Sequence, residues 1–184
     1  FLRDEYLPVA REQVGLSAMK GGDKLYEQLI ESTTTLPLKA DEIHKLGLSE
    51  VDRIKGELEK LKEEVGFDGT LTEFFDYVRT DPKFKPKSRE ALTQSYYDIG
   101  KRVDEKIGDY FSLTPKADLV IKPYDPSIEQ FQAGGSYQSG TPDGSRPGTF
   151  NFNAYDLPSR LTPGNVTLYL HEGEPGHHFQ ISLA

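Results

Sequence analysis

Three of the four histidines of this 184-residue chain lie within eight residues, in the sequence HEGEPGHH from His171 to His178. Histidine nitrogens and glutamate oxygens are common zinc ligands. Zinc peptidases often carry them as His-Glu-x-x-His on one helix. Residues four apart share a face there, and the Glu beside the first His can act as general base. His171 and Glu172 supply the first half of this pattern, so we interpret the stretch as a candidate zinc site.

The second half of the pattern is displaced, because Pro175 occupies the position where the second histidine would fall. On a regular helix, a residue six positions on points roughly 120° away, and one seven positions on lies about 10.5 Å along the axis. Pro175 and Gly176 favour a local bulge, since proline lacks an N–H and glycine tolerates unusual backbone angles. Such a bulge could bring His177 beside His171. His178 is the alternative metal ligand to His177.

The residues just before the motif must fix it in place. A helix is expected from about Asn165, after Pro163-Gly164, with apolar residues anchoring it in a core. The preceding GTFNFN, from Gly148, alternates apolar and polar residues as a half-buried strand does. We expect this to be an exposed edge strand that pairs with an extended peptide substrate. The Gly-, Ser- and Pro-rich residues 132–147 predict turns or a loop.

Further polar groups could contact a substrate. A phenol or a guanidinium can stabilise negative charge that develops on a carbonyl oxygen. On this ground Tyr137, Arg146 and Tyr169 are candidate substrate or oxyanion contacts, although packing explains each equally well. His44, alone in ADEIHKLG, is better explained as an ordinary exposed or core histidine.

The first half of the chain predicts helices. We expect a helical region over residues 1–115 and a β and loop segment with the metal-motif helix over 116–184, both in one larger domain. The fold class is mainly α with a small β element, α+β. The expected helices are 22–32, a short one ending near Gly47, 49–66, 71–79, and 88–111 with Ser88 as N-cap.

Composition limits the classes of function. The net charge of −8 argues against a nucleic-acid partner. The chain has no cysteine, so a metal must be held by nitrogen and oxygen. No apolar run approaches the ~18 residues of a membrane span. The first residue is Phe1 rather than an initiator Met, and we expect the sequence to be an excerpt of a longer protein.

Several stretches, among them YLPVAREQVGLS, EIHKLGLSEVDRI, DGSRPGTFNFN and HEGEPGHHFQ, resemble the bacterial family called domain of unknown function 885, placed among zincin-type metallopeptidases. The resemblance implies an internal fragment of a larger, helical, zincin-like metallopeptidase of the cell envelope, exported or lipid-anchored. It implies zinc ligation by His171 and His177, with His178 as the alternative, and Glu172 as general base. A third ligand, a glutamate, would follow residue 184.

The expected activity is therefore zinc-dependent hydrolysis of a peptide substrate by metal-activated water, with the fragment alone inactive. Two alternatives remain open. One is a non-catalytic binding or interaction module of the cell envelope, and the other is a protein that only binds metal through its histidines.

Overall fold

The computed structural model describes residues 1–184, which divide into two compact units, Phe1–Leu71 and Thr72–Ala184. None of the helices combines the length and the apolar character needed to cross a bilayer. Single helical turns precede α1 (Gly22–Thr34) or lie between the longer elements; they are Leu2–Tyr6, Leu7–Val9, Leu16–Ala18, Pro82–Phe84, Glu129–Phe131, Leu157–Ser159 and Thr162–Gly164.

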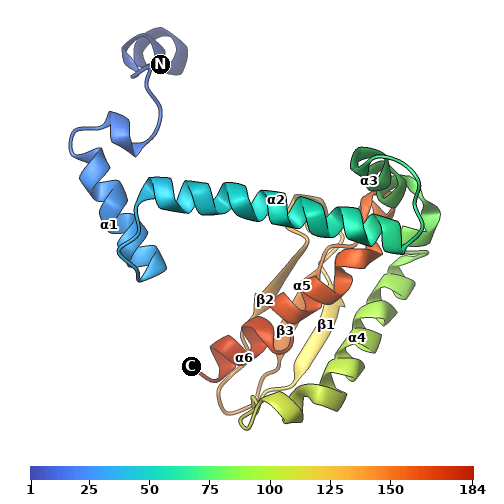
Figure 1. Ribbon diagram of the computed structural model, residues 1–184. Helices are drawn as coiled ribbons and strands as arrows, with labels where there is room; N and C mark the ends of the chain where they lie inside the picture. Colours follow the sequence, from blue (N-terminus) through green and yellow to red (C-terminus); the bar gives the residue numbers. More distant parts are fainter. The chain divides into compact units, whose positions relative to one another are not determined.

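The first unit contains two long helices, α1 (Gly22–Thr34) and α2 (Ala40–Glu64) (Figure 1). The predicted helix end near Gly47 is wrong, since α2 continues through that residue. A glycine inside a helix costs only about 1 kcal/mol, and here good helix formers follow it. At the start of α2, the Lys39 N–H donates to the Glu42 carboxylate at 2.8 Å, which satisfies one of the free N–H groups of the first turn.

The second unit opens with α3 (Leu71–Thr80) and α4 (Arg89–Tyr110). The predicted cap of α4 is confirmed: Ser88 Oγ accepts a hydrogen bond from the Ala91 N–H at 3.1 Å. The region expected to be helical over residues 1–115 therefore extends into both units, and its last two helices belong with the strands that follow.

A three-stranded sheet forms the centre of the second unit, with the order β1 (Leu119–Pro123), β3 (Gly148–Phe152), β2 (Gly135–Gln138). β3 pairs in parallel with β1 and antiparallel with β2. The expectation that GTFNF is an edge strand is therefore wrong. β2 lies in a segment that was predicted to be a loop, because Gly and Ser have weak strand propensity. The segment forms a strand nevertheless, since β3 supplies its hydrogen-bond partners.

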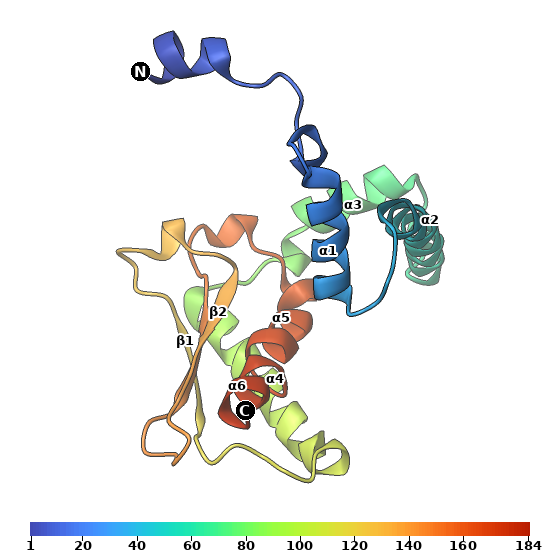
Figure 2. The same cartoon turned by 90° about the vertical axis from the view of Figure 1, so that its left-hand side faces the viewer.

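The core lies between the sheet and the helices that cover one of its faces. Figure 2 shows α4, α5 (Asn165–Glu172) and α6 (Gly176–Ser182) on the same side of the strands. Phe150 and Phe152 of β3 are fully buried. Both rings contact Tyr96 of α4, with centroids 5.1 and 4.7 Å away, and Phe150 packs edge-on against Tyr169 of α5. The mostly helical α+β class predicted from the sequence is confirmed.

Phe150→Ala tests this core. The substitution should lower the free energy of unfolding by about 3–5 kcal/mol, because it leaves a cavity between β3 and the helices. Phe131, which is 77% exposed in the same unit, provides the control, and Phe131→Ala should change stability by less than about 0.5 kcal/mol. Urea unfolding followed by far-UV circular dichroism measures both, and equal effects would contradict the placement of Phe150.

Candidate metal centre

The sequence HEGEPGHH forms two short helices rather than one bulged helix. α5 ends at Glu172 and α6 starts at Gly176, with a cis peptide bond between Glu174 and Pro175. The expected bulge inside a single helix is therefore replaced by a complete break. Pro175 lacks the N–H that a continuous helix would use, and it sits at the start of α6, where that N–H would have no partner.

The two helices approach each other closely at Gly176. A Cβ atom built on this residue would collide with the backbone carbonyl group of His171 in α5. Backbone atoms cannot rotate away from such a clash, so the close approach of α6 to α5 requires glycine at this position. The sequence predicted that Gly176 allows a distorted backbone. The structure shows that it also allows α6 to pack closely against α5.

The break brings together His171, Glu172 and His177, called the candidate cluster below. One ligand atom from each residue lies within 4.8 Å of the other two. The His171 and His177 rings are nearly perpendicular, with centroids 4.8 Å apart. His177 Nε2 lies 4.0 Å from Glu172 Oε2. Residues six apart, which diverge on a regular helix, thus converge here.

The donor set and its surroundings fit a zinc ion. Tetrahedral zinc with ligands at ~2.0–2.1 Å places two donor nitrogens about 3.4 Å apart, so small side-chain rotations would let His171 and His177 share one ion. The side-chain oxygen Oε1 of Gln180 lies 2.8 Å from His177 Nδ1. When Nδ1–H donates a hydrogen bond to this oxygen, the Nε2 lone pair is left free for the cluster. Metal-bound histidines typically donate their second N–H in this way. Glu172 is 13% exposed and His177 is 36% exposed, so solvent reaches the cluster.

His178, the alternative ligand, is placed elsewhere. Its side chain is 1% exposed, and both ring nitrogens have partners. Nε2 lies 3.0 Å from the Ala117 carbonyl oxygen and Nδ1 lies 2.9 Å from the Tyr137 hydroxyl. Burial lowers the pKa of His178, and the hydrogen bond to Ala117 partly opposes that effect. Because neither nitrogen is free, His177 rather than His178 is the partner of His171 in this structure.

The three candidate substrate contacts lie in different settings. Tyr137, in β2, is bonded to His178. The Arg146 guanidinium donates to the Ser139 carbonyl at 2.8 Å and so closes the turn that joins β2 to β3. Tyr169 is 2% exposed in the core, and burial raises the pKa of its hydroxyl. These contacts give all three residues structural roles, and contact with a substrate stays a prediction.

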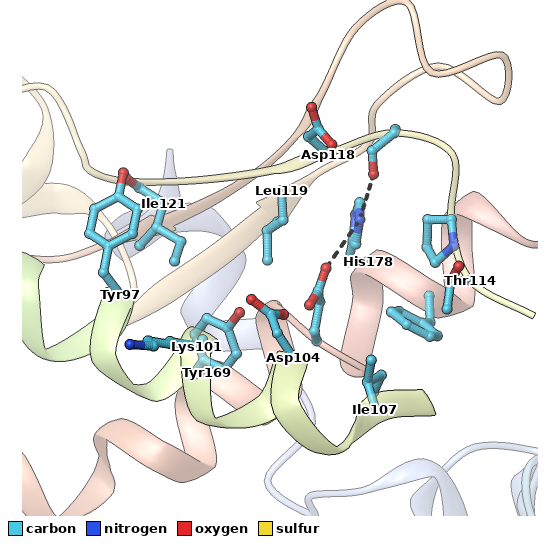
Figure 3. Close-up of a pocket in the computed structure, with 15 residues that line it drawn as sticks. Tyr97, Lys101, Asp104, Ile107, Thr114, Asp118, Leu119, Ile121, Tyr169 and His178 are labelled. Atoms are coloured by element: carbon cyan, nitrogen blue, oxygen red, sulfur yellow. Dashed lines mark hydrogen bonds and ion pairs between the residues drawn. The ribbon is translucent and has the colours of Figure 1, made fainter. Parts of the chain in front are cut away.

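A pocket of about 640 Å³ lies between α4, β1 and the α5–α6 break. Figure 3 shows its lining, with Asp104 of α4 and the His178 ring both bordering it. Glu174 also lines this pocket. Burial, with a hydrogen bond to Asp104 and the charge of that residue, raises the pKa of Glu174 to about 7. Nothing in the sequence pattern indicated that Asp104 and Glu174 would meet.

Comparison with known proteins places this arrangement in a family. Residues 1–184 match the family described as "Bacterial protein of unknown function (DUF885)". The chain belongs to this family. The family resemblance read from the sequence is therefore confirmed, whereas the family description assigns no activity. No curated protein matches the chain.

A solved structure shares the fold. The crystal structure of "the putative lipoprotein from Colwellia psychrerythraea" superposes with a TM-score of 0.85 at 31% sequence identity. The match covers 96% of this chain and 31% of that chain. The 184 residues thus correspond to less than a third of the length of that protein.

Gly176→Ala tests the close approach of the two helices. The added methyl group should push α6 away from His171, lower the stability of the metal-free protein by about 1–3 kcal/mol, and weaken zinc binding. Gly164→Ala is the control, because Gly164 has a negative φ and open space around its Cβ position. Urea unfolding and zinc titration measure the two effects, and a Gly176→Ala protein that matches the control in both would contradict this account.

Proposed function

We propose that this chain carries part of the active site of a zinc-dependent peptidase of the bacterial cell envelope. The observation that carries the proposal is the convergence of His171, Glu172 and His177 within 4.8 Å, despite their irregular spacing. In hydrolytic zinc sites of this kind, two imidazoles hold the metal and an adjacent carboxylate acts as general base. The family supplies the bacterial context, and the similar lipoprotein supports an envelope location.

Each residue of the candidate cluster has a separate role in the proposal. His171 and His177 would hold the ion, with His177 kept in the correct tautomer by Gln180. A zinc ion bound there would lower the pKa of a water molecule and polarise a peptide carbonyl. Glu172 would accept the proton of that water and deliver it to the leaving amine. Its position directly after His171 in the chain keeps its carboxylate beside the two imidazoles.

Catalytic zinc sites usually have three protein ligands, and the two histidines account for two. The proposal includes a third ligand from outside these 184 residues, in the longer protein. An extended peptide substrate could pair with the outer edge of β2, since β3 already has a partner on each side. α5, which carries His171, lies against β2, so a peptide bound there would run near the metal helix.

Glu172→Gln in the complete protein provides the main test. The variant should retain stoichiometric zinc, measured by elemental analysis, and lose peptide hydrolysis by about 10²–10⁴-fold, because the general base is absent. His171→Ala and His177→Ala should each lose the zinc. His44→Ala is the control for removing a histidine, because His44 is exposed on α2.

Unchanged turnover of Glu172→Gln would rule out the assigned base. A folded complete protein that binds no zinc would favour a non-catalytic envelope module. Zinc binding without hydrolysis, unaffected by substitution of Glu172, would favour a protein that only binds metal.

A further inference from the structure

His178 is a buried polar side chain with a hydrogen-bond partner at each ring nitrogen. The Ala117 carbonyl can only accept, so Nε2 carries a proton and donates to that carbonyl at 3.0 Å. Nδ1 lies 2.9 Å from the Tyr137 hydroxyl. The two ring nitrogens are therefore bonded to two different segments of the chain.

These bonds attach α6 to the sheet. Ala117 lies two residues before the start of β1, and Tyr137 belongs to β2 at the opposite edge of the sheet. The Tyr137 hydroxyl also lies 3.3 Å from Ser182 Oγ, one turn further along α6. Two points on one helix face contact the same hydroxyl, so α6 can neither rotate nor slide without breaking one of these bonds. Figure 3 shows the His178 ring below the segment that carries Asp118, with a dashed line from the ring to that segment for the hydrogen bond to the Ala117 carbonyl.

The first residue of β3 leaves room for this arrangement. A Cβ atom on Gly148 would lie 2.7 Å from His178 Nδ1 and would also collide with the Tyr137 hydroxyl. Gly148 is in the central strand, where its backbone N–H donates to the Asp118 carbonyl at 2.8 Å. The strand cannot easily move, so any larger residue here would displace the two side chains that hold α6.

We propose that His178 is a positioning residue that holds α6 in the orientation in which the neighbouring His177 faces His171 and Glu172. Adjacent residues on a helix point about 100° apart, so one can be bonded to the sheet while the other faces the candidate cluster. His177 and His178 thus have different roles. His178 fixes the orientation of α6, and the His177 ring faces the candidate cluster. Metal binding by His177 rests on the proposed function, whereas the orientation of the His177 side chain does not.

Two substitutions of His178 separate bonding from packing. His178→Phe keeps an aromatic ring and removes both hydrogen bonds, whereas His178→Gln retains one donor for Ala117 and one acceptor for Tyr137. Tyr137→Phe removes one of the bonds while leaving the histidine in place. His44→Phe is the control, because it removes an exposed histidine from the other unit.

The first measurement uses the metal-free protein labelled with ¹⁵N-histidine. In the complete protein, the ring signals of His171, His177 and His178 can be assigned by substituting each of them in turn. Long-range ¹H–¹⁵N spectra should show His178 as the Nε2–H tautomer. In His178→Phe, the ring signals of His171 and His177 should shift or broaden, and in His178→Gln they should stay close to those of the unsubstituted protein.

The second measurement is titration of the complete protein with Co²⁺, followed by its visible absorption. His178→Phe should weaken Co²⁺ binding by about 10-fold or more, the range found when a group that orients a metal ligand is lost. Tyr137→Phe should have a smaller effect in the same direction, and His178→Gln should restore most of the affinity. Circular dichroism and the urea midpoint establish that each variant is folded.

Unchanged His171 and His177 signals together with unchanged Co²⁺ affinity in folded His178→Phe would overturn the proposal. If that variant does not fold, Tyr137→Phe decides the question by the same two measurements. An unsubstituted protein that binds no Co²⁺ would count against the proposed peptidase function, while the metal-free spectra would still decide whether His178 positions His177.

Discussion

The candidate site depends on one constraint, which is that an α-helix cannot continue normally through Pro175. The missing N–H and the bulk of the ring end α5 at Glu172 and start a new helix at Gly176. The change of direction makes His171 and His177 neighbours, although a regular helix would place residues six apart on different faces. Gly176 makes the new packing possible, since any side chain there would collide with the last turn of α5.

The second constraint concerns the polar ring of His178, which is buried beside the apolar core. Burying an imidazole without partners costs free energy, and His178 avoids this cost by bonding through both nitrogens. The aromatic core formed by Phe150, Phe152 and Tyr169 supports the same region, because these rings fix α5 against β3. Packing positions α5, and directional hydrogen bonds position α6. The candidate cluster lies where these two helices meet.

Two glutamates separated by one residue have different surroundings. Glu172 lies beside the two imidazoles of the candidate cluster, whereas Glu174 lines the pocket with Asp104 and has a raised pKa of about 7. The break between α5 and α6 turns them in different directions, so only Glu172 lies beside His171 and His177. The family is bacterial, and the similar solved structure is described as a putative lipoprotein.

The sequence by itself determined α1, α3 and α4, the cap at Ser88, the α+β class and the position of the candidate cluster, because these follow from periodicity and from residue types within a few positions. Only the tertiary structure decided that β3 is central, that Gly135–Gln138 forms a strand, and that His177 rather than His178 faces His171. Strand order and the direction of α6 depend on partners far away in the chain. His178 is fixed by Ala117 and Tyr137, which are 61 and 41 residues distant, and local spacing contains no record of such contacts.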